Sequence, residues 1–99
     1  MNTKEEIIEF LRQNRELLSQ RYHVSKIWLF GSFARGEQTH GSDVDLLVDL
    51  DDGISDVYDT KNALKDFLSA SFGRDVDIAR EKYLKPYAKE HILKDALYV

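Results

Sequence analysis

The feature that most constrains the fold of this chain is the run Asp43–Leu50, DVDLLVDL, in which apolar residues follow one another almost without interruption. A strand with one face in water alternates apolar and polar side chains, whereas a strand buried on both faces reads as a near-continuous apolar run. Such a strand needs protein on both sides of its sheet. The run therefore predicts the α/β (α+β) class, with a small sheet covered by helices.

Two shorter stretches complete the predicted sheet. Lys26–Phe30, KIWLF, is rich in residues that favour strands, and Gly31 ends it. Asp75–Ala79, DVDIA, predicts a third strand, in which aspartates stand among apolar residues.

Helical periodicity predicts one helix before the first strand and another between the second and third strands. The Thr3–Glu6 sequence is a capping box that opens a first helix, expected to fade near Arg21, with apolar positions Ile7, Phe10, Leu11 and Leu18. A second helix is capped by Ser55 or Asp56, ends near Gly73 and has an inner stripe of Val57, Leu64, Phe67 and Leu68.

The last segment predicts one more helix and an apolar chain end. The helix begins at about Leu84, has Pro86 in its first turn, and presents Leu84, Ala88, Ile92 and Ala96 on one side. The final four residues, ALYV, are apolar, which indicates docking against the body of the protein or against a partner.

Length and composition limit the class of protein. The 99 residues predict a single domain spanning 1–99, and 42% hydrophobic with 32% charged residues is an ordinary balance for a folded protein. The chain has no cysteine, so it contains no disulfide or thiolate metal site. No apolar run approaches the roughly 20 residues of a membrane helix, and the N-terminus is too acidic for a signal peptide. We therefore expect a cytoplasmic protein.

The charge balance bears on the ligand. Fourteen basic and 18 acidic residues give a net charge of −4, which argues against direct binding of a nucleic acid backbone. A small anionic ligand held through metal ions remains compatible with this charge.

Asp43 and Asp45 are the candidate site. Because side chains alternate along a strand, both lie on one face, with Cα atoms about 6.5–7 Å apart, while Val44, Leu46 and Val48 point to the opposite face. Two like charges at this spacing on a half-buried strand repel each other and resist desolvation. A cation relieves that repulsion, and hard carboxylate oxygens suit Mg²⁺, whose remaining ligands are commonly substrate phosphates. The alternative is a solvated strand end without chemistry.

Two further features strengthen the metal and phosphate interpretation. Gly31-Ser32 follows a strand directly, and a glycine turn that enters a helix can hold anionic oxygens through its N–H groups and hydroxyl. Asp77, between Val76 and Ile78, supplies a third carboxylate if its strand neighbours the first pair. Three carboxylates can hold two metal ions, as in phosphoryl and nucleotidyl transfer.

The string GSFARGEQTHGSDVDLLV, residues 31–48, together with the distant strand aspartate, resembles the DNA polymerase beta-like nucleotidyltransferase superfamily. It is most similar to the minimal nucleotidyltransferase (MNT) branch, in which Gly-Ser-x-Ala-Arg-Gly and Ser-Asp-x-Asp-Leu recur. The resemblance covers nearly the whole chain. It implies the nucleotidyltransferase fold with a small mixed sheet, nucleotide phosphates held by Gly31 and Ser32, and metal ligation by Asp43, Asp45 and Asp77.

The same resemblance implies a reaction and a partner. Stand-alone MNT proteins resemble antitoxins that use Mg²⁺ and ATP to transfer AMP to tyrosine hydroxyls of a HEPN-type ribonuclease toxin, which predicts a hetero-oligomer. Two alternatives stay open. The chain could neutralise a toxin by occlusion alone, or it could modify a small molecule with an acceptor-binding subunit in trans.

Several residues keep two interpretations. Arg35 could contact the nucleotide or a partner, or form an ion pair with Glu37. Asp75 shares a face with Asp77, but Asp77 is preferred because its flanking residues place it inside the strand. The histidines are scattered in polar surroundings and are expected on the surface: His23, His40 and His91.

Overall fold

The computed structural model describes residues 1–99 and has the predicted α/β architecture. The elements follow in the order α1 (Lys4–Gln13), α2 (Arg15–Tyr22), β1 (Val24–Phe30), α3 (Gly31–Arg35), β2 (Val44–Leu50), α4 (Val57–Phe72), β3 (Val76–Arg80), the 3₁₀ turn η1 (Glu81–Tyr83), α5 (Pro86–Asp95) and β4 (Leu97–Tyr98). None of these helices combines the length and the apolar character needed to cross a membrane.

The four strands form one mixed sheet in the order β3-β2-β1-β4. β1 pairs antiparallel with both β2 and β4, whereas β2 pairs parallel with β3. β2 therefore has a neighbour on each side, and Leu46 and Leu47, which point to opposite faces, are both fully buried. Burial on both faces confirms the interpretation of the DVDLLVDL run.

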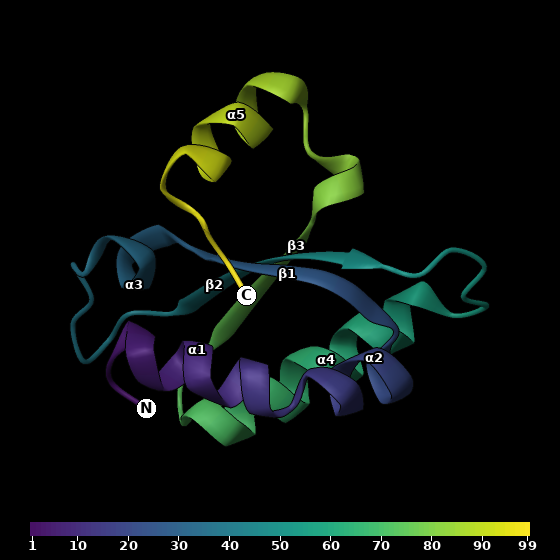
Figure 1. The fold of residues 1–99 in the computed structure, drawn as a ribbon, viewed down its shortest axis with the longest axis horizontal. Helices are drawn as coiled ribbons and strands as arrows, with labels where there is room; N and C mark the ends of the chain where they lie inside the picture. The colour runs from purple at the N-terminus through teal and green to yellow at the C-terminus, as the bar shows by residue number, and fades with distance from the viewer.

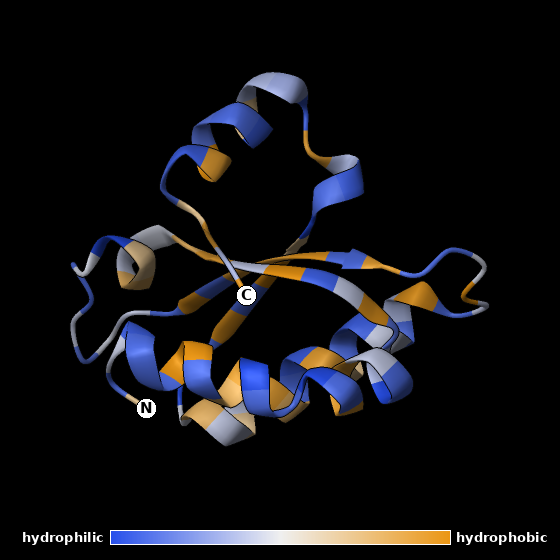
Figure 2. Ribbon diagram, viewed as in Figure 1, coloured by the Kyte–Doolittle hydropathy of each residue, from blue (hydrophilic) through white to orange (hydrophobic).

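The two faces of the sheet are covered differently (Figure 1). Helices α1, α2 and α4 form a layer against one face, and α5 stands over the other face, with α3 at one end of the sheet. Apolar residues of the three-helix layer belong to the main core cluster, among them Ile7, Leu11, Leu18, Leu64 and Leu68, and the orange segments in Figure 2 mark apolar residues along these helices. Val44, Leu46 and Val48 are fully buried in the main core cluster, as predicted.

The first helix begins as predicted and ends earlier. The Glu6 N–H donates to Thr3 Oγ1 at 3.2 Å, and hydrogen bonds from the Asn2 backbone and the Thr3 hydroxyl lower the pKa of Glu6. The prediction of one helix to Arg21 is wrong, because α1 ends at Gln13 and α2 starts at Arg15. Asn14 explains the break: its Nδ2 and its backbone N–H both donate to the Phe10 carbonyl, at 2.8 and 3.1 Å, so its side chain competes for helical partners.

The last helix is shorter than predicted and is only partly buried. α5 starts at Pro86 after an extended Lys85, and Ala96 already has extended backbone angles, so it lies beyond the helix. No residue of α5 is buried, and the predicted inner stripe is half-buried at best. α5 therefore covers its face of the sheet loosely.

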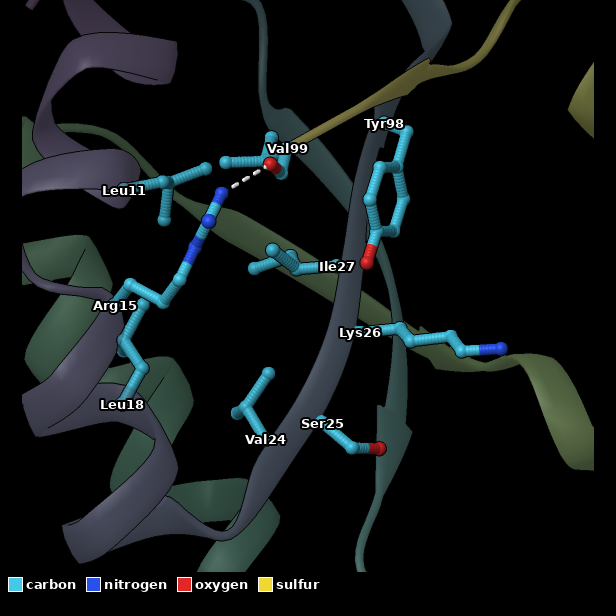
Figure 3. Close-up of a pocket in the computed structure, with 9 residues that line it drawn as sticks. All are labelled: Leu11, Arg15, Leu18, Val24, Ser25, Lys26, Ile27, Tyr98 and Val99. Atoms are coloured by element: carbon cyan, nitrogen blue, oxygen red, sulfur yellow. Dashed lines mark hydrogen bonds between the residues drawn. The ribbon is translucent and has the colours of Figure 1, made fainter.

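The chain end docks on the body of the protein, one of the two predicted outcomes. Leu97 and Tyr98 pair with Leu29 and Trp28 as strand β4, which the sequence analysis did not predict. Val99 is buried, and Arg15 of α2 donates to its carbonyl oxygen, as Figure 3 shows. The cavity in that view, about 110 Å³, lies between the first two helices and β1 with β4, and no candidate site residue lines it.

Candidate active site

The sheet brings two of the three predicted carboxylates side by side. Parallel pairing of β2 with β3 places Asp45 opposite Asp77, and antiparallel pairing with β1 places Asp45 opposite Phe30. Paired residues share a face, so Asp45 and Asp77 lie on the face away from the three-helix layer. Asp75 precedes β3, and its carbonyl accepts the Val44 N–H at 2.9 Å. The choice of Asp77 over Asp75 thus agrees with the strand register.

Asp45 is the candidate carboxylate whose pKa is shifted by its surroundings. It is half-buried, and burial is the main cause that raises its pKa above the ordinary range; the charges of Asp77 and Asp43 raise it further. Arg35 acts in the opposite direction and lowers this pKa, without cancelling the rise. The site therefore carries negative charge that the chain's own cations do not fully balance.

Gly31 is required by its contact with Asp45. Its φ is +74°, in the left-handed region, and a Cβ built on it would lie 2.2 Å from Asp45 Oδ2. Any other residue would displace the carboxylate, in addition to the strain of that backbone conformation. The turn after β1 and the aspartate of β2 are thus packed directly against each other.

The turn itself leads into α3, a helix of five residues. Phe30 precedes it in extended conformation and contributes no side-chain cap, and Phe33 and Ala34 are buried behind it. Ser32 is half-buried, and its carbonyl accepts the Glu37 N–H at 2.9 Å. Without a cap, the N–H groups of this first turn suit an anionic group of a ligand.

Arg35 forms the predicted ion pair with Glu37, and its contact with a nucleotide or a partner stays a prediction. Its Nε lies 3.1 Å from Glu37 Oε2 in an exposed ion pair. It also acts on Asp45 and lines a cavity of about 200 Å³ together with Gly31.

That cavity brings in residues that the sequence analysis assigned to the surface or did not single out for chemistry. It lies between the turn after β1 and α5, and its lining is Phe30, Gly31, Arg35, His91, Ile92 and Asp95. His91 and Asp95 are exposed, as expected for His91, yet they face the candidate phosphate turn. Their spacing of four residues places them on one side of a helix, but only the packing of α5 shows what that side faces.

Asp43, the remaining predicted metal ligand, lies outside the strands. It is exposed, and it lies in the loop that precedes the first paired residue of β2, Val44. The three aspartates do not form a group that could hold a metal ion as they stand, because no cluster of three or more His, Cys, Asp or Glu side chains with that arrangement occurs in the protein.

Comparisons with known proteins agree with this geometry. The family model of the nucleotidyltransferase domain matches residues 6–99. Protein MJ1379 of Methanocaldococcus jannaschii, provisionally named a protein adenylyltransferase, is 39% identical over 100 residues, covering 100% of both chains. The protein adenylyltransferase MntA of Thermococcus cleftensis is 35% identical over 99 residues, which cover 100% of this chain and 98% of that protein.

A solved structure supports the same assignment. It is described provisionally as a minimal nucleotidyltransferase, is 32% identical, and superposes with a TM-score of 0.80 over 96% of this chain and 94% of that chain. The chain therefore belongs to the nucleotidyltransferase domain family, within its minimal nucleotidyltransferases.

Proposed function

We propose that this nucleotidyltransferase is a Mg²⁺-dependent protein adenylyltransferase that transfers AMP from ATP to a tyrosine hydroxyl of a HEPN-type ribonuclease toxin, and so acts as its antitoxin. The observation that carries the proposal is the pairing of Asp45 with Asp77 directly against the Gly31 turn. The names of the relatives MJ1379 and MntA support protein adenylylation as the reaction.

The residues present suit divalent metal ions. Burial raises the pKa of the half-buried Asp45, and the charges of Asp77 and Asp43 raise it further; a cation would relieve that repulsion. All three candidates offer hard oxygen donors, which Mg²⁺ prefers. Bound there by Asp43, Asp45 and Asp77, magnesium would neutralise phosphate charge and lower the pKa of the acceptor hydroxyl.

The chain's own groups then have distinct tasks. The Gly31-Ser32 turn binds the triphosphate through its N–H groups and the Ser32 hydroxyl, and Arg35 adds a positive charge at the same edge. The cavity beneath α5 receives the nucleoside end of the same molecule, because it opens beside Gly31. Asp77 lies toward the acceptor and takes its proton.

The reaction is a substitution at phosphorus. The tyrosine oxygen attacks the α-phosphorus, the bond between that phosphorus and the bridging oxygen to the β-phosphate breaks, and pyrophosphate leaves with the electron pair. The hydroxyl proton goes to Asp77 and then to solvent. Positioning of the two reactants contributes much of the rate, as in other phosphoryl transfers.

The partner part of the proposal draws on more distant proteins with the same fold. One solved structure, 23% identical with a TM-score of 0.68, is of a toxin–antitoxin with AMP-PNP. Another, 20% identical with a TM-score of 0.59, is of a tri-AMPylated HEPN toxin of Shewanella oneidensis in complex with its MNT antitoxin. We extend this kind of partner to the present chain on the basis of the shared fold and family.

The deciding experiment mixes the protein with a candidate HEPN-type partner, ATP and Mg²⁺, and measures the mass of the partner. We expect the partner to gain one or more adenylyl groups on tyrosine. Asp77→Ala should stop the gain while retaining most of the nucleotide affinity and the protein–protein complex, because Asp43 and Asp45 still face the triphosphate.

The same variants separate the alternatives in cells. Loss of labelling should coincide with loss of protection from the partner. If the Asp43, Asp45 and Asp77 variants protect as well as the wild type and no adenylylated partner is found, the chain acts by occlusion and the proposal fails. Transfer to a small molecule alone would also contradict it.

A further inference from the structure

We propose that Arg74 is a positioning residue that holds the loop before β2 in the shape that aims the Asp43 carboxylate at the site. The inference rests on the proposed function, because it concerns the same magnesium and nucleotide site. Arg74 was not singled out from the sequence, and it lies in the turn between Gly73, which follows α4, and Asp75, which precedes β3.

Every nitrogen of the Arg74 guanidinium group has a partner. Nε donates to the Met1 carbonyl at 2.8 Å, and Nη2 donates to Asn2 Oδ1 at 3.1 Å. Nη1 donates to three loop carbonyls, those of Thr39, His40 and Ser42, each at 3.0 Å. The plane of the group also lies over the Phe33 ring of α3, with Cζ 5.0 Å from the ring centroid.

Only arginine matches this set of partners. Three carbonyl oxygens converge on one nitrogen that carries two hydrogens, so at least one hydrogen is shared, and two further acceptors lie on other sides of the group. A guanidinium group offers five donors in a fixed plane, whereas a lysine ammonium is a single point of charge that cannot reach acceptors on separate sides.

The loop that Arg74 holds leads directly to Asp43. The last carbonyl in the set belongs to Ser42, and it shares a rigid peptide plane with the Asp43 nitrogen. The ladder begins only one residue later, at Val44. The position of the Asp43 carboxylate therefore depends on the loop and not on strand pairing.

Few other contacts hold this loop. A Cβ built on Gly36 or on Gly41 would meet no atom within 4 Å. The Thr39 N–H donates to Ser42 Oγ at 2.8 Å, and the Ser42 N–H returns to the Thr39 carbonyl at 3.1 Å. Gln38 adds one bond to the Asn2 carbonyl. Loss of the guanidinium group would leave the turn at Thr39–Ser42 without its link to β3.

We assign this role to the geometry of the guanidinium group, because Arg74 is not among the groups that shift the pKa of Asp45. The basic residue whose charge lowers the pKa of Asp45 is Arg35. A substitution that keeps the charge of Arg74 and removes the planar set of donors should therefore fail to replace it.

The test compares Arg74→Lys with Arg15→Lys in the full chain. Arg15 is the matched control, because its side chain also makes a partly buried bond to a backbone carbonyl, at Val99, away from the site. Amide hydrogen exchange is measured first without ligand. Calorimetry then gives the Mg²⁺ concentration that half-saturates binding of a non-hydrolysable ATP analogue, and transfer assays give kcat.

We expect Arg74→Lys to speed exchange at the Thr39 and Ser42 amides while the amides of β2 stay protected, and to raise half-saturating Mg²⁺ about 10-fold, the usual scale for residues that orient a metal ligand. Arg15→Lys should lower the melting temperature without changing exchange at the Thr39 and Ser42 amides or the half-saturating Mg²⁺ concentration. Ser42→Ala, which loosens the same turn, should shift half-saturating Mg²⁺ in the same direction even if Arg74→Lys fails to fold.

The remaining outcomes decide which of the two claims fails. Unchanged half-saturating Mg²⁺ in both loop variants overturns the positioning role and leaves Arg74 as a structural residue. A wild type that binds the magnesium–nucleotide complex but modifies no partner contradicts the proposed function, while the exchange and binding shifts still decide the role of Arg74. A wild type that binds no magnesium–nucleotide complex overturns both.

Discussion

The two faces of strand β2 have opposite character although their residues alternate along one short stretch. Val44, Leu46 and Val48 are fully buried against the three-helix layer and contribute to stability through apolar area removed from water. Asp45, on the other face, is a half-buried carboxylate beside Asp77, and its raised pKa shows that burial and like charge disfavour its ionised form. The first face is apolar throughout, whereas the other combines the buried Leu47 with charge that the fold must tolerate.

The largest effects should come from adjacent residues on these two faces. Asp45→Asn should reduce adenylyl transfer on the order of 1,000-fold, or about 4 kcal/mol of barrier, yet leave the ligand-free protein as stable as the wild type or more so. Leu46→Ala should lower the free energy of unfolding by about 2–5 kcal/mol through loss of core packing. Urea unfolding and a transfer assay on both variants measure the contrast. Unfolding of ligand-free Asp45→Asn would show that the aspartate is structural.

The next prediction tests the contact between Gly31 and the Asp45 carboxylate. Gly31→Ala places a Cβ 2.2 Å from Asp45 Oδ2, so we expect transfer to fall on the order of 100-fold, as for small displacements of reacting groups. Gly36→Ala is the matched control, because its φ of +72° is nearly the same but nothing lies within 4 Å of the added Cβ. It should cost only about 1–2 kcal/mol of stability.

A double variant identifies the cause of the Gly31 effect. Gly31→Ala combined with Asp45→Ala removes the clashing carboxylate. The double variant should therefore lose less free energy of unfolding than the two single variants lose in sum. Strict additivity in urea unfolding would show that the backbone angle at Gly31, and not the clash with Asp45, limits substitution.

A smaller effect is expected from the helix that covers the charged face. Ile92→Trp fills part of the cavity of about 200 Å³ beside Gly31, and we expect it to weaken ATP-analogue binding about 10-fold, or about 1.4 kcal/mol. Glu90→Trp places the same side chain at an exposed position of α5 that does not line the cavity. Equal affinities for the two variants in calorimetry would exclude the cavity as the nucleoside site.

The smallest effect is the pH dependence of stability at Asp45. Because its folded-state pKa is raised above the ordinary value of 3.8, the folded protein binds this proton more tightly than the unfolded chain. The free energy of unfolding therefore rises as the pH falls through the folded pKa toward 3.8, and the ionised carboxylate lowers stability above that window.

Asp45→Asn removes this dependence and provides the check. Above the folded pKa of Asp45 the variant should be more stable than the wild type, and the gain should vanish as the pH falls below 3.8. Thermal unfolding across this range measures the difference, and a gain that stays constant at low pH would point to a cause other than ionisation.

Much of the fold could be predicted because its signals are local. Thr3 and Asp56 cap helices where the sequence indicates, and β1, β2 and β3 lie within two residues of their expected bounds. The break at Asn14 was missed because an apolar helical stripe continues across it, while one side-chain hydrogen bond decides the local geometry. Strand β4 was missed because two residues carry no detectable periodicity.

The candidate site also has a part that local sequence patterns predict and a part that they do not. The side of β2 on which Asp45 lies follows from the two-residue repeat of extended backbone, and the turn at Gly31-Ser32 follows from residue type. The prediction that Asp43 belongs to the same strand is wrong, because β2 begins at Val44 and Asp43 lies in the loop before it. The contact of Gly31 with Asp45 and the wall formed by α5 join residues distant in sequence, so no local pattern contains them.

The sequence by itself determined most of the elements, the apolar face of β2, and the residues proposed to bind metal and phosphate, because backbone periodicity and side-chain chemistry are properties of short segments. Only the tertiary structure decided that Asp77 lies opposite Asp45, that Arg74 holds the loop before Asp43, and that His91 faces the turn at Gly31. Strand register and helix docking depend on how all segments bury apolar surface together, and that selection involves the whole chain at once.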